Sequence, residues 1–144
     1  MAVQERERQL RLVAEILLIH LPAQLAEDQP LAHDLLAVVG TALHAIHEDA
    51  EQSAKAWDKK AYHVKADELR REWDWALGAA NYATGLALRA EPLTLDTLVK
   101  VRRIIRPELT RPSRRQIPDP ARFRGAAQAV KVQQAQKRAP VRGG

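Results

Sequence analysis

The chain contains no cysteine, one phenylalanine, one methionine and two serines among its 144 residues. The absence of cysteine excludes disulfide bonds, thiolate catalysis and cysteine metal sites. Ser53 and Ser113 do not stand in the glycine elbow of a serine hydrolase. The six glycines are too scattered to form a phosphate-binding loop. We therefore expect a non-enzymatic protein without a cofactor.

Strand-forming sequence is also scarce. Hydrophobic residues make up 46% of the chain, but alanine, leucine and valine supply most of them and aromatic residues only 4%. Alanine, leucine and arginine favour helices, and runs of β-branched or aromatic residues are missing. These features predict an all-α fold: an antiparallel bundle of about four helices over residues 1–106. A basic, partly disordered extension over residues 107–144 is expected to follow it.

No apolar run looks long enough for a membrane span. The longest, Leu10 to Leu21, is interrupted by Arg11, Glu15 and His20, whereas a spanning helix needs about 20 apolar residues. The charged residues before this run do not resemble a secretory signal. Lack of cysteine is compatible with a reducing compartment. We expect a cytoplasmic protein without a membrane partner.

Apolar spacing and proline positions predict the helix boundaries. Asp28 or Gln29 is expected to cap a helix that has Pro30 in its first turn, and Thr94 or Asp96 to cap a later one. A polar stretch predicts a break near 48–55, and the next helix is expected to be the central one. The predicted helices cover residues 3–21, about 30–47, 55–89, 94–106 and, in the extension, 119–131.

The predicted helix over residues 55–89 has two faces to bury. Trp73 and Trp75 differ by about 200° of rotation at 3.6 residues per turn, so they cannot both face one core. Trp75 then shares a second stripe with Arg71 and Tyr82. This stripe either packs inside the chain, or forms a homodimer interface, or is an exposed surface that stacks on rings or bases.

Small residues are concentrated in the second half of the same predicted helix. Gly78 and Gly85 stand among five alanines between residues 76 and 87. A glycine inside a helix costs about 1 kcal/mol relative to alanine. We interpret both glycines as positions where another helix packs closely.

Charge is divided unevenly along the chain. Residues 1–99 carry 10 Lys or Arg and 16 Asp or Glu, whereas residues 100–144 carry 13 and 2. An acidic body with a basic end is a pattern typical of chains that use the basic part for interaction. The basic segment is therefore the first candidate for function.

Arginine far outnumbers lysine in this segment, and its planar guanidinium suits phosphate oxygens. Three roles remain open for these cations: binding the backbone of RNA or DNA, docking on an acidic partner or on the protein's own acidic body, and keeping the chain soluble. We expect a small helical subunit or adaptor that binds nucleic acid; the alternative is a homo-oligomeric interaction module. The candidate residues are Lys100, Arg102, Arg103, Arg106, Arg111, Arg114, Arg115, Arg122 and Arg124.

One weak metal-site pattern is present. His44, His47, Glu48 and Glu51 recur at helical spacings of three and four. Imidazole and carboxylate groups placed in this way can share a metal ion inside a bundle. However, the Glu-x-x-His motif of di-metal bundles is absent, so a solvated polar face is the preferred interpretation and no metal is expected.

Overall fold

The structure, a computed structural model, describes residues 2–105 and 116–138, with side chains from residue 5 onward. All regular secondary structure in these ranges is helical, which confirms the all-α prediction. The elements are α1 (Ala2–Glu15), the π-helical turn η1 (Ile16–His20), α2 (Leu21–Glu27), α3 (Gln29–Lys59), α4 (His63–Trp73), α5 (Trp75–Leu88), α6 (Leu95–Arg103), the 3-10 turn η3 (Pro120–Phe123) and α7 (Ala126–Arg138).

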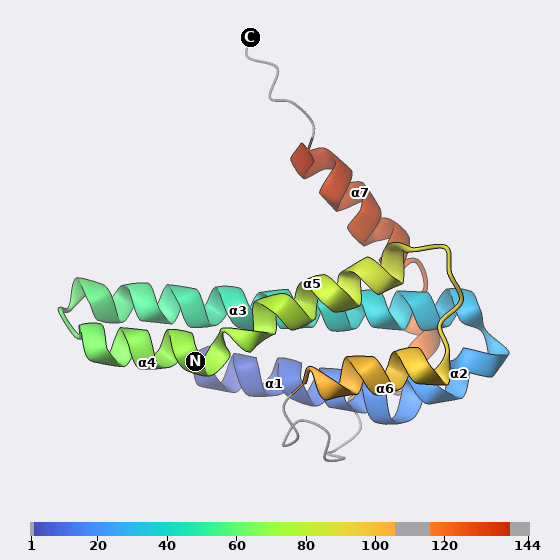
Figure 1. Cartoon of the computed structure of the whole chain (residues 1–144), viewed down its shortest axis with the longest axis horizontal. Coiled ribbons are helices and arrows are strands. Elements are labelled where there is room, and N and C mark those ends of the chain that lie inside the picture. Colours follow the sequence, from blue (N-terminus) through green and yellow to red (C-terminus); the bar gives the residue numbers. More distant parts are fainter. Residues whose placement is uncertain (1, 106–115, 139–144) are drawn as a thin grey trace, which may run out of the picture.

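Helix α3, and not the predicted helix over 55–89, is the central element. It runs the length of the molecule, and α1, α4, α5 and α7 all contact it (Figure 1). Its inward face carries Leu35, Leu43 and Ile46, each with no exposed surface. Val13 and Leu17 from the first helical segment complete the same core. The apolar stripes of these two segments therefore pack as their spacing predicts.

The predicted helix break near residues 48–55 is wrong. The inward face continues from Ile46 through Ala50 and Ala54, at steps of four, and both alanines are buried. The polar residues of this stretch also have partners: the Arg6 guanidinium binds the Asp49 carboxylate at 2.7 Å. Alanine carries little hydrophobicity, so the sequence pattern appeared to lose its phase where the helix in fact continues.

The predicted helix over residues 55–89 is divided in the structure. Its first residues end α3, and a turn at residues 60–62 leads into α4. A second interruption falls at Asp74, although this residue keeps right-handed helical angles (φ −57°, ψ −37°). Arg71 and Trp75 consequently belong to different helices.

The first helix extends beyond its predicted end at residue 21. Pro22 lies in the first turn of α2, directly after the π-helical turn η1. Proline lacks an N–H and its ring crowds the carbonyl four residues earlier. A widened π turn accommodates such a residue without ending the helix.

This extension also lengthens the apolar segment. Within the part of the chain that the structure describes, Glu5–Glu27 is the one helical stretch long and apolar enough, by length and composition, to cross a membrane. The prediction that this apolar run is too short to span a membrane assumed that the helix ends at Pro22. In the structure, 44% of the relevant window is buried inside the molecule, where its leucines pack against α3. Core helices meet the same criterion.

The glycine positions differ from the prediction. A Cβ atom added at Gly78 or Gly85 would meet nothing within 4 Å, so neither glycine is a close-packing position. Gly40 on α3 has that role, because a Cβ atom there would collide with Thr84 Oγ1 and lie 3.2 Å from the Thr84 backbone N. The close approach of α3 and α5 therefore depends on Gly40.

Both predicted caps are present. The Asp28 carboxylate accepts the Leu31 N–H at 3.1 Å at the start of α3. Thr94 and Thr97 form a reciprocal capping box at the start of α6. The loop before α6 is held by Gln29, whose side chain bonds both the backbone N–H and the C=O of Leu93.

Candidate functional site

The predicted cations of α6 differ in their availability. Lys100 pairs with Asp96 at 3.1 Å, and both side chains are more than half exposed. Arg102 is half-buried and donates to the Leu17 carbonyl at 2.5 Å, so it ties α6 to the first helical segment. Arg103 is exposed. Arg102 is therefore a structural contact, and Lys100 and Arg103 are the accessible cations of this helix.

The remaining candidates fall in the C-terminal segment. Arg106, Arg111, Arg114 and Arg115 lie outside the described residues. Arg122 is exposed, with its guanidinium 4.7 Å from the centroid of its neighbour Phe123. Arg124 binds the Asp28 carboxylate at 2.7 Å. This ion pair lowers the pKa of Asp28, with the Leu31 N–H contributing further.

Residues 116–127 dock on the body mainly through their backbone. The buried Glu15 carboxylate accepts the N–H groups of Gln116 and Ile117, and Ile117 is 1% exposed. His20 Nε2 lies 2.6 Å from the same carboxylate. Burial acts to raise the pKa of Glu15, but the hydrogen bonds from Gln116, His20 and Ile117 outweigh it and lower the pKa. Glu15 therefore anchors the C-terminal segment as an ionised group.

Asp34 of α3 fixes the start of α7. Its two carboxylate oxygens accept the N–H groups of Gly125 and Ala127, each at 2.9 Å. Gly125 has φ +92°, a conformation that glycine adopts without strain. The predicted helix over 119–131 is thus split into η3 and α7, and α7 continues to Arg138.

Helix α7 projects from the bundle (Figure 1). Ala126, Ala127 and Val130 pack against the core, at the end held by Asp34. The helix carries Lys131, Lys137 and Arg138, all exposed, and no acidic residue. It is a cationic arm attached at one end.

The predicted second stripe does not form one surface. Trp75 is half-buried and packs against the core, with its ring centroid 6.2 Å from that of Trp73. Tyr82, two helical turns further along α5, is 39% exposed. Arg71 is exposed on α4. Trp75 therefore contributes to intrachain packing, and Tyr82 and Arg71 are accessible.

The weak metal candidates do not converge. In the described ranges, no three His, Asp or Glu side chains are placed to hold a metal ion. Glu51 accepts a hydrogen bond from Arg70 instead. Burial, together with the neighbouring charges of Lys137 and His47, lowers the pKa of His44. His44, Glu48 and Lys137 line a cavity of about 280 Å³ between α3, α5 and α7.

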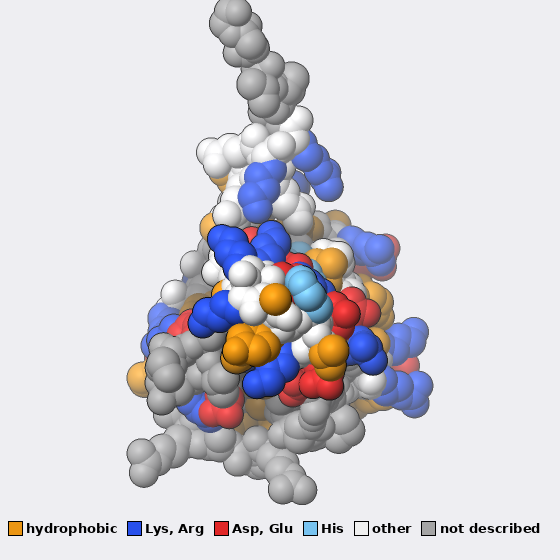
Figure 2. Space-filling view, turned by 90° about the vertical axis from the view of Figure 1, so that its left-hand side faces the viewer, with side chains coloured by type: hydrophobic (Ala, Val, Ile, Leu, Met, Phe, Trp, Pro, Cys, Tyr) orange, Lys and Arg blue, Asp and Glu red, His pale blue; other side chains and the backbone are white. Residues whose placement is uncertain are grey.

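A second cationic surface occupies the end of the molecule where α3 meets α4. We call residues 57–65 the hairpin tip. Lys59, Lys60 and Lys65 are exposed there beside Tyr62 and Val64, which are 52% and 71% exposed. Figure 2 faces this end and shows Lys and Arg atoms, with Asp and Glu atoms among them, around hydrophobic and histidine atoms. The sequence did not indicate this site, because its pattern predicted a continuous helix through residues 57–65.

The turn of the hairpin tip has a defined hydrogen-bond pattern. The Tyr62 N–H donates to the Trp57 carbonyl and the Ala61 N–H to the Asp58 carbonyl, each at 2.9 Å. This is the Schellman arrangement, in which the residue after the helix takes left-handed angles. That residue is Ala61, with φ +64°. Edge-to-face packing of Trp57 and Tyr62, at 5.6 Å between ring centroids, supplies the accompanying hydrophobic contact.

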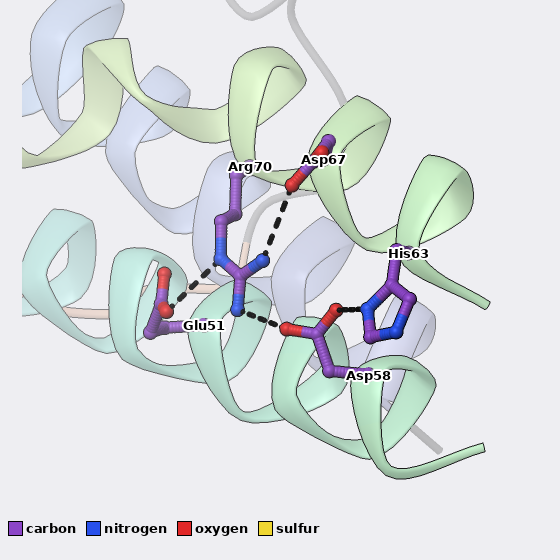
Figure 3. Close-up of polar contacts among 5 residues, drawn as sticks. All are labelled: Glu51, Asp58, His63, Asp67 and Arg70. Carbon is purple, nitrogen blue, oxygen red and sulfur yellow. Dashed lines mark hydrogen bonds and ion pairs between the residues drawn. The ribbon is translucent and has the colours of Figure 1, made fainter. Parts of the chain in front are cut away.

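An ion-pair network supports the hairpin tip from the inner side (Figure 3). Arg70 on α4 reaches Glu51 at 3.2 Å and Asp58 at 2.8 Å on α3, and Asp67 on its own helix at 3.5 Å. His63 Nδ1 lies 2.8 Å from the other Asp58 oxygen. Hydrogen bonds from Arg70, and then from His63, lower the pKa of Asp58. The network joins α3 to α4 just below the turn.

The fold and these sites define the class of protein as an all-α helical bundle with two separate cationic surfaces, α7 and the hairpin tip. Comparisons of the chain with protein-family models, with curated proteins and with solved structures found no match.

Proposed function

We propose that this protein is a non-enzymatic helical adaptor that binds the phosphate backbone of RNA or DNA through its C-terminal segment, with α7 as the main contact. The observation that carries the proposal is the cationic arm itself. Lys131, Lys137 and Arg138 are exposed on a helix without a carboxylate. A helix of this kind can lie along a nucleic acid without electrostatic repulsion from its own side chains.

The attachment of α7 supports the same proposal. Asp34 and the Arg124–Asp28 ion pair hold the beginning of the arm. Lys131 and Arg138 are exposed on this arm (Figure 1), and Lys137, although exposed, also lines the cavity shared with His44 and Glu48 of α3. Arg103 and Arg122 add exposed cations outside α7. The groups that touch the body, Arg102 and Arg124, are assigned to anchoring and not to binding.

Salt dependence tests the proposal quantitatively. Each phosphate contact contributes about 0.9 to the slope of log affinity against log salt for duplex DNA, and about 0.7 for a single strand. Replacing Lys131, Lys137 and Arg138 with glutamine is expected to reduce this slope by about 2–3. Fluorescence anisotropy with labelled duplex and single-stranded oligonucleotides, from about 50 to 200 mM salt, measures the slope.

The matched control changes the same number of charges elsewhere. Arg8, Arg11 and Arg89 are exposed cations outside both cationic surfaces, and their triple glutamine variant alters net charge equally. A general charge effect lowers affinity in both variants alike. Wild-type protein that binds neither probe at about 50 mM salt disproves the proposal.

A second candidate function is a homo-oligomeric interaction module whose basic segment docks on an acidic partner or on its own body. The Arg124–Asp28 ion pair favours it, because it engages one of the predicted cations with the acidic body. Sedimentation of the wild type against Tyr82→Arg tests the oligomer. Tyr82 is exposed, so a mass that halves in the variant supports the module, and an unchanged monomeric mass removes it.

A further inference from the structure

We infer that the hairpin tip is a second nucleic-acid contact, which binds the phosphodiester backbone through Lys60 and Lys65 without reading bases. This inference rests on the proposed function and adds to it a site on the opposite part of the fold. It gives the protein two anchoring points on one strand or duplex, one at α7 and one where α3 meets α4.

The aromatic residues of the hairpin tip hold the lysines in place. Lys65 Nζ lies 5.0 Å from the centroid of the Trp57 ring and 5.8 Å from that of Tyr62. Lys60 Nζ lies 6.0 Å from the Trp57 ring. A cation over a ring face is attracted by the ring's quadrupole. The ammonium groups are therefore held beside the rings, where phosphates can reach them.

The nearby carboxylates of Asp58 and Asp67 pair with other groups than these lysines. Asp58 and Asp67 are engaged by Arg70, and Asp58 also by His63. Across the described residues, no ion pair joins a carboxylate to Lys60 or Lys65. Arg70 therefore occupies these carboxylates, whereas the ammonium groups of Lys60 and Lys65 lie beside the Trp57 ring.

The turn itself is held in an unfavourable conformation. A non-glycine residue with left-handed angles costs about 1–2 kcal/mol, and Ala61 adopts them with φ +64°. Residues in such conformations persist where the surroundings impose them, and they cluster at functional sites. Here the imposed turn brings Lys60 and Lys65 close to the aromatic pair, which orders the cations before a ligand arrives.

A nucleic acid fits this surface better than a membrane does. Interfacial insertion needs a continuous apolar face. The hairpin tip offers only Val64 and part of Tyr62 as well-exposed large apolar groups, and Trp57 is half-buried behind them. Lysines dominate the exposed surface, so electrostatic contact with phosphates is the main attraction.

The length of α3 separates the two contacts. Lys137 of α7 lines a cavity with His44 and Glu48. These two residues precede Lys59 of the hairpin tip on the same helix by about 23 and 17 Å at 1.5 Å per residue. A nucleic acid bound at one site is therefore presented to the other at a raised effective concentration. Loss of either site therefore weakens overall binding by a factor equal to that site's own association constant multiplied by the effective concentration.

The experiment compares two variants with equal charge changes in the full-length protein. Lys60→Gln/Lys65→Gln removes the ammonium groups at the hairpin tip, and Arg11→Gln/Arg89→Gln removes two exposed cations elsewhere. With a labelled single-stranded oligonucleotide long enough to reach both sites, the first variant should bind about tenfold more weakly at about 50 mM salt and lose about 1–2 from the salt slope. The second variant should stay close to wild type.

The outcomes separate this inference from the proposed function. Equal behaviour of the two variants, with the α7 triple variant still defective, overturns the hairpin-tip contact alone. Wild-type protein that fails to bind the oligonucleotide overturns both. Vesicles of phosphatidylcholine with phosphatidylserine form a further arm. Vesicle binding that needs Lys60 and Lys65, without oligonucleotide binding that needs them, also overturns the inference and assigns the surface to a membrane.

Discussion

The Glu15 carboxylate and the Ile117 N–H meet at 3.1 Å although 102 residues separate them in the chain. Glu15 also accepts from the Gln116 N–H and lies against His20. With Ile117 buried beside it, this contact ties the C-terminal segment to the first helical segment. A single ionised side chain thus fixes residues 116 and 117 on the body, and the Asp28 and Asp34 carboxylates hold the segment further along.

Glu15→Gln should destabilise the protein by about 1–3 kcal/mol at neutral pH, because buried N–H groups lose a charged acceptor. The pKa of Glu15 is lowered in the folded state. Its contribution is therefore complete above the unfolded pKa of about 4.3 and is lost as pH falls through the folded pKa. Urea unfolding at several pH values should show a smaller acid-induced loss in the variant than in the wild type. The exposed Glu7→Gln serves as the control, and identical pH profiles for all three proteins contradict the assignment.

Ala61→Gly should stabilise the protein by about 1 kcal/mol, since glycine adopts left-handed angles without the steric cost that alanine bears. The matched control is Ala56→Gly on the exposed face of α3, which should lose about 1 kcal/mol through helix propensity. Chemical denaturation of both variants measures the difference. A loss of stability in both would mean that residue 61 is not in the left-handed region.

Gly40→Ala should destabilise the protein by about 1–3 kcal/mol, because the added methyl group overpacks the contact between α3 and α5 at Thr84. Gly85→Ala is the control. Its new methyl group meets nothing within 4 Å, so improved helix propensity should raise stability by up to about 1 kcal/mol. Thermal unfolding followed by circular dichroism reports both changes, and opposite signs are the expected result.

Arg70→Gln should raise the pKa of Asp58 toward its ordinary value near 3.9, because Arg70 is the first of the two groups that lower it. Titration of the side-chain carboxyl by NMR measures this directly. Arg71→Gln, one residue away and exposed, should leave the Asp58 titration almost unchanged. An equal shift in both variants would attribute the lowered pKa to general charge and not to the ion pair.

Local sequence signals predicted much of the fold. Asp28 and Thr94 carry cap chemistry that depends only on near neighbours, and the large apolar side chains of the first two segments mark their buried faces. The hydrophobic pattern failed to predict the buried face of a helix where that face consists of small residues. Ala50 and Ala54 continue the buried face of α3, but alanine is too weakly hydrophobic to show it.

The candidate sites were harder to predict, because their geometry depends on distant contacts. No residue near Ala61 predicts a turn, because residues 60–62 contain no glycine, proline or asparagine. The sequence consequently placed Lys60 and Lys65 within one continuous helix, about 140° apart around its axis. The role of Arg102 depends on the Leu17 carbonyl, 85 residues away, and that of Asp34 on Gly125. The sequence identified the cationic residues, but it could not distinguish those that hold two parts of the fold together from those that are exposed.

The unbroken course of α3 has a geometric consequence for the whole molecule. Each residue of an α-helix advances the axis by about 1.5 Å and turns it by about 100°. One residue inserted between Ala50 and Ala54 would swing the α4 end around the axis by roughly a quarter of a circle relative to the start of α7. The number of residues in α3 therefore sets both the distance between the molecule's two ends and their relative rotation about the helix axis.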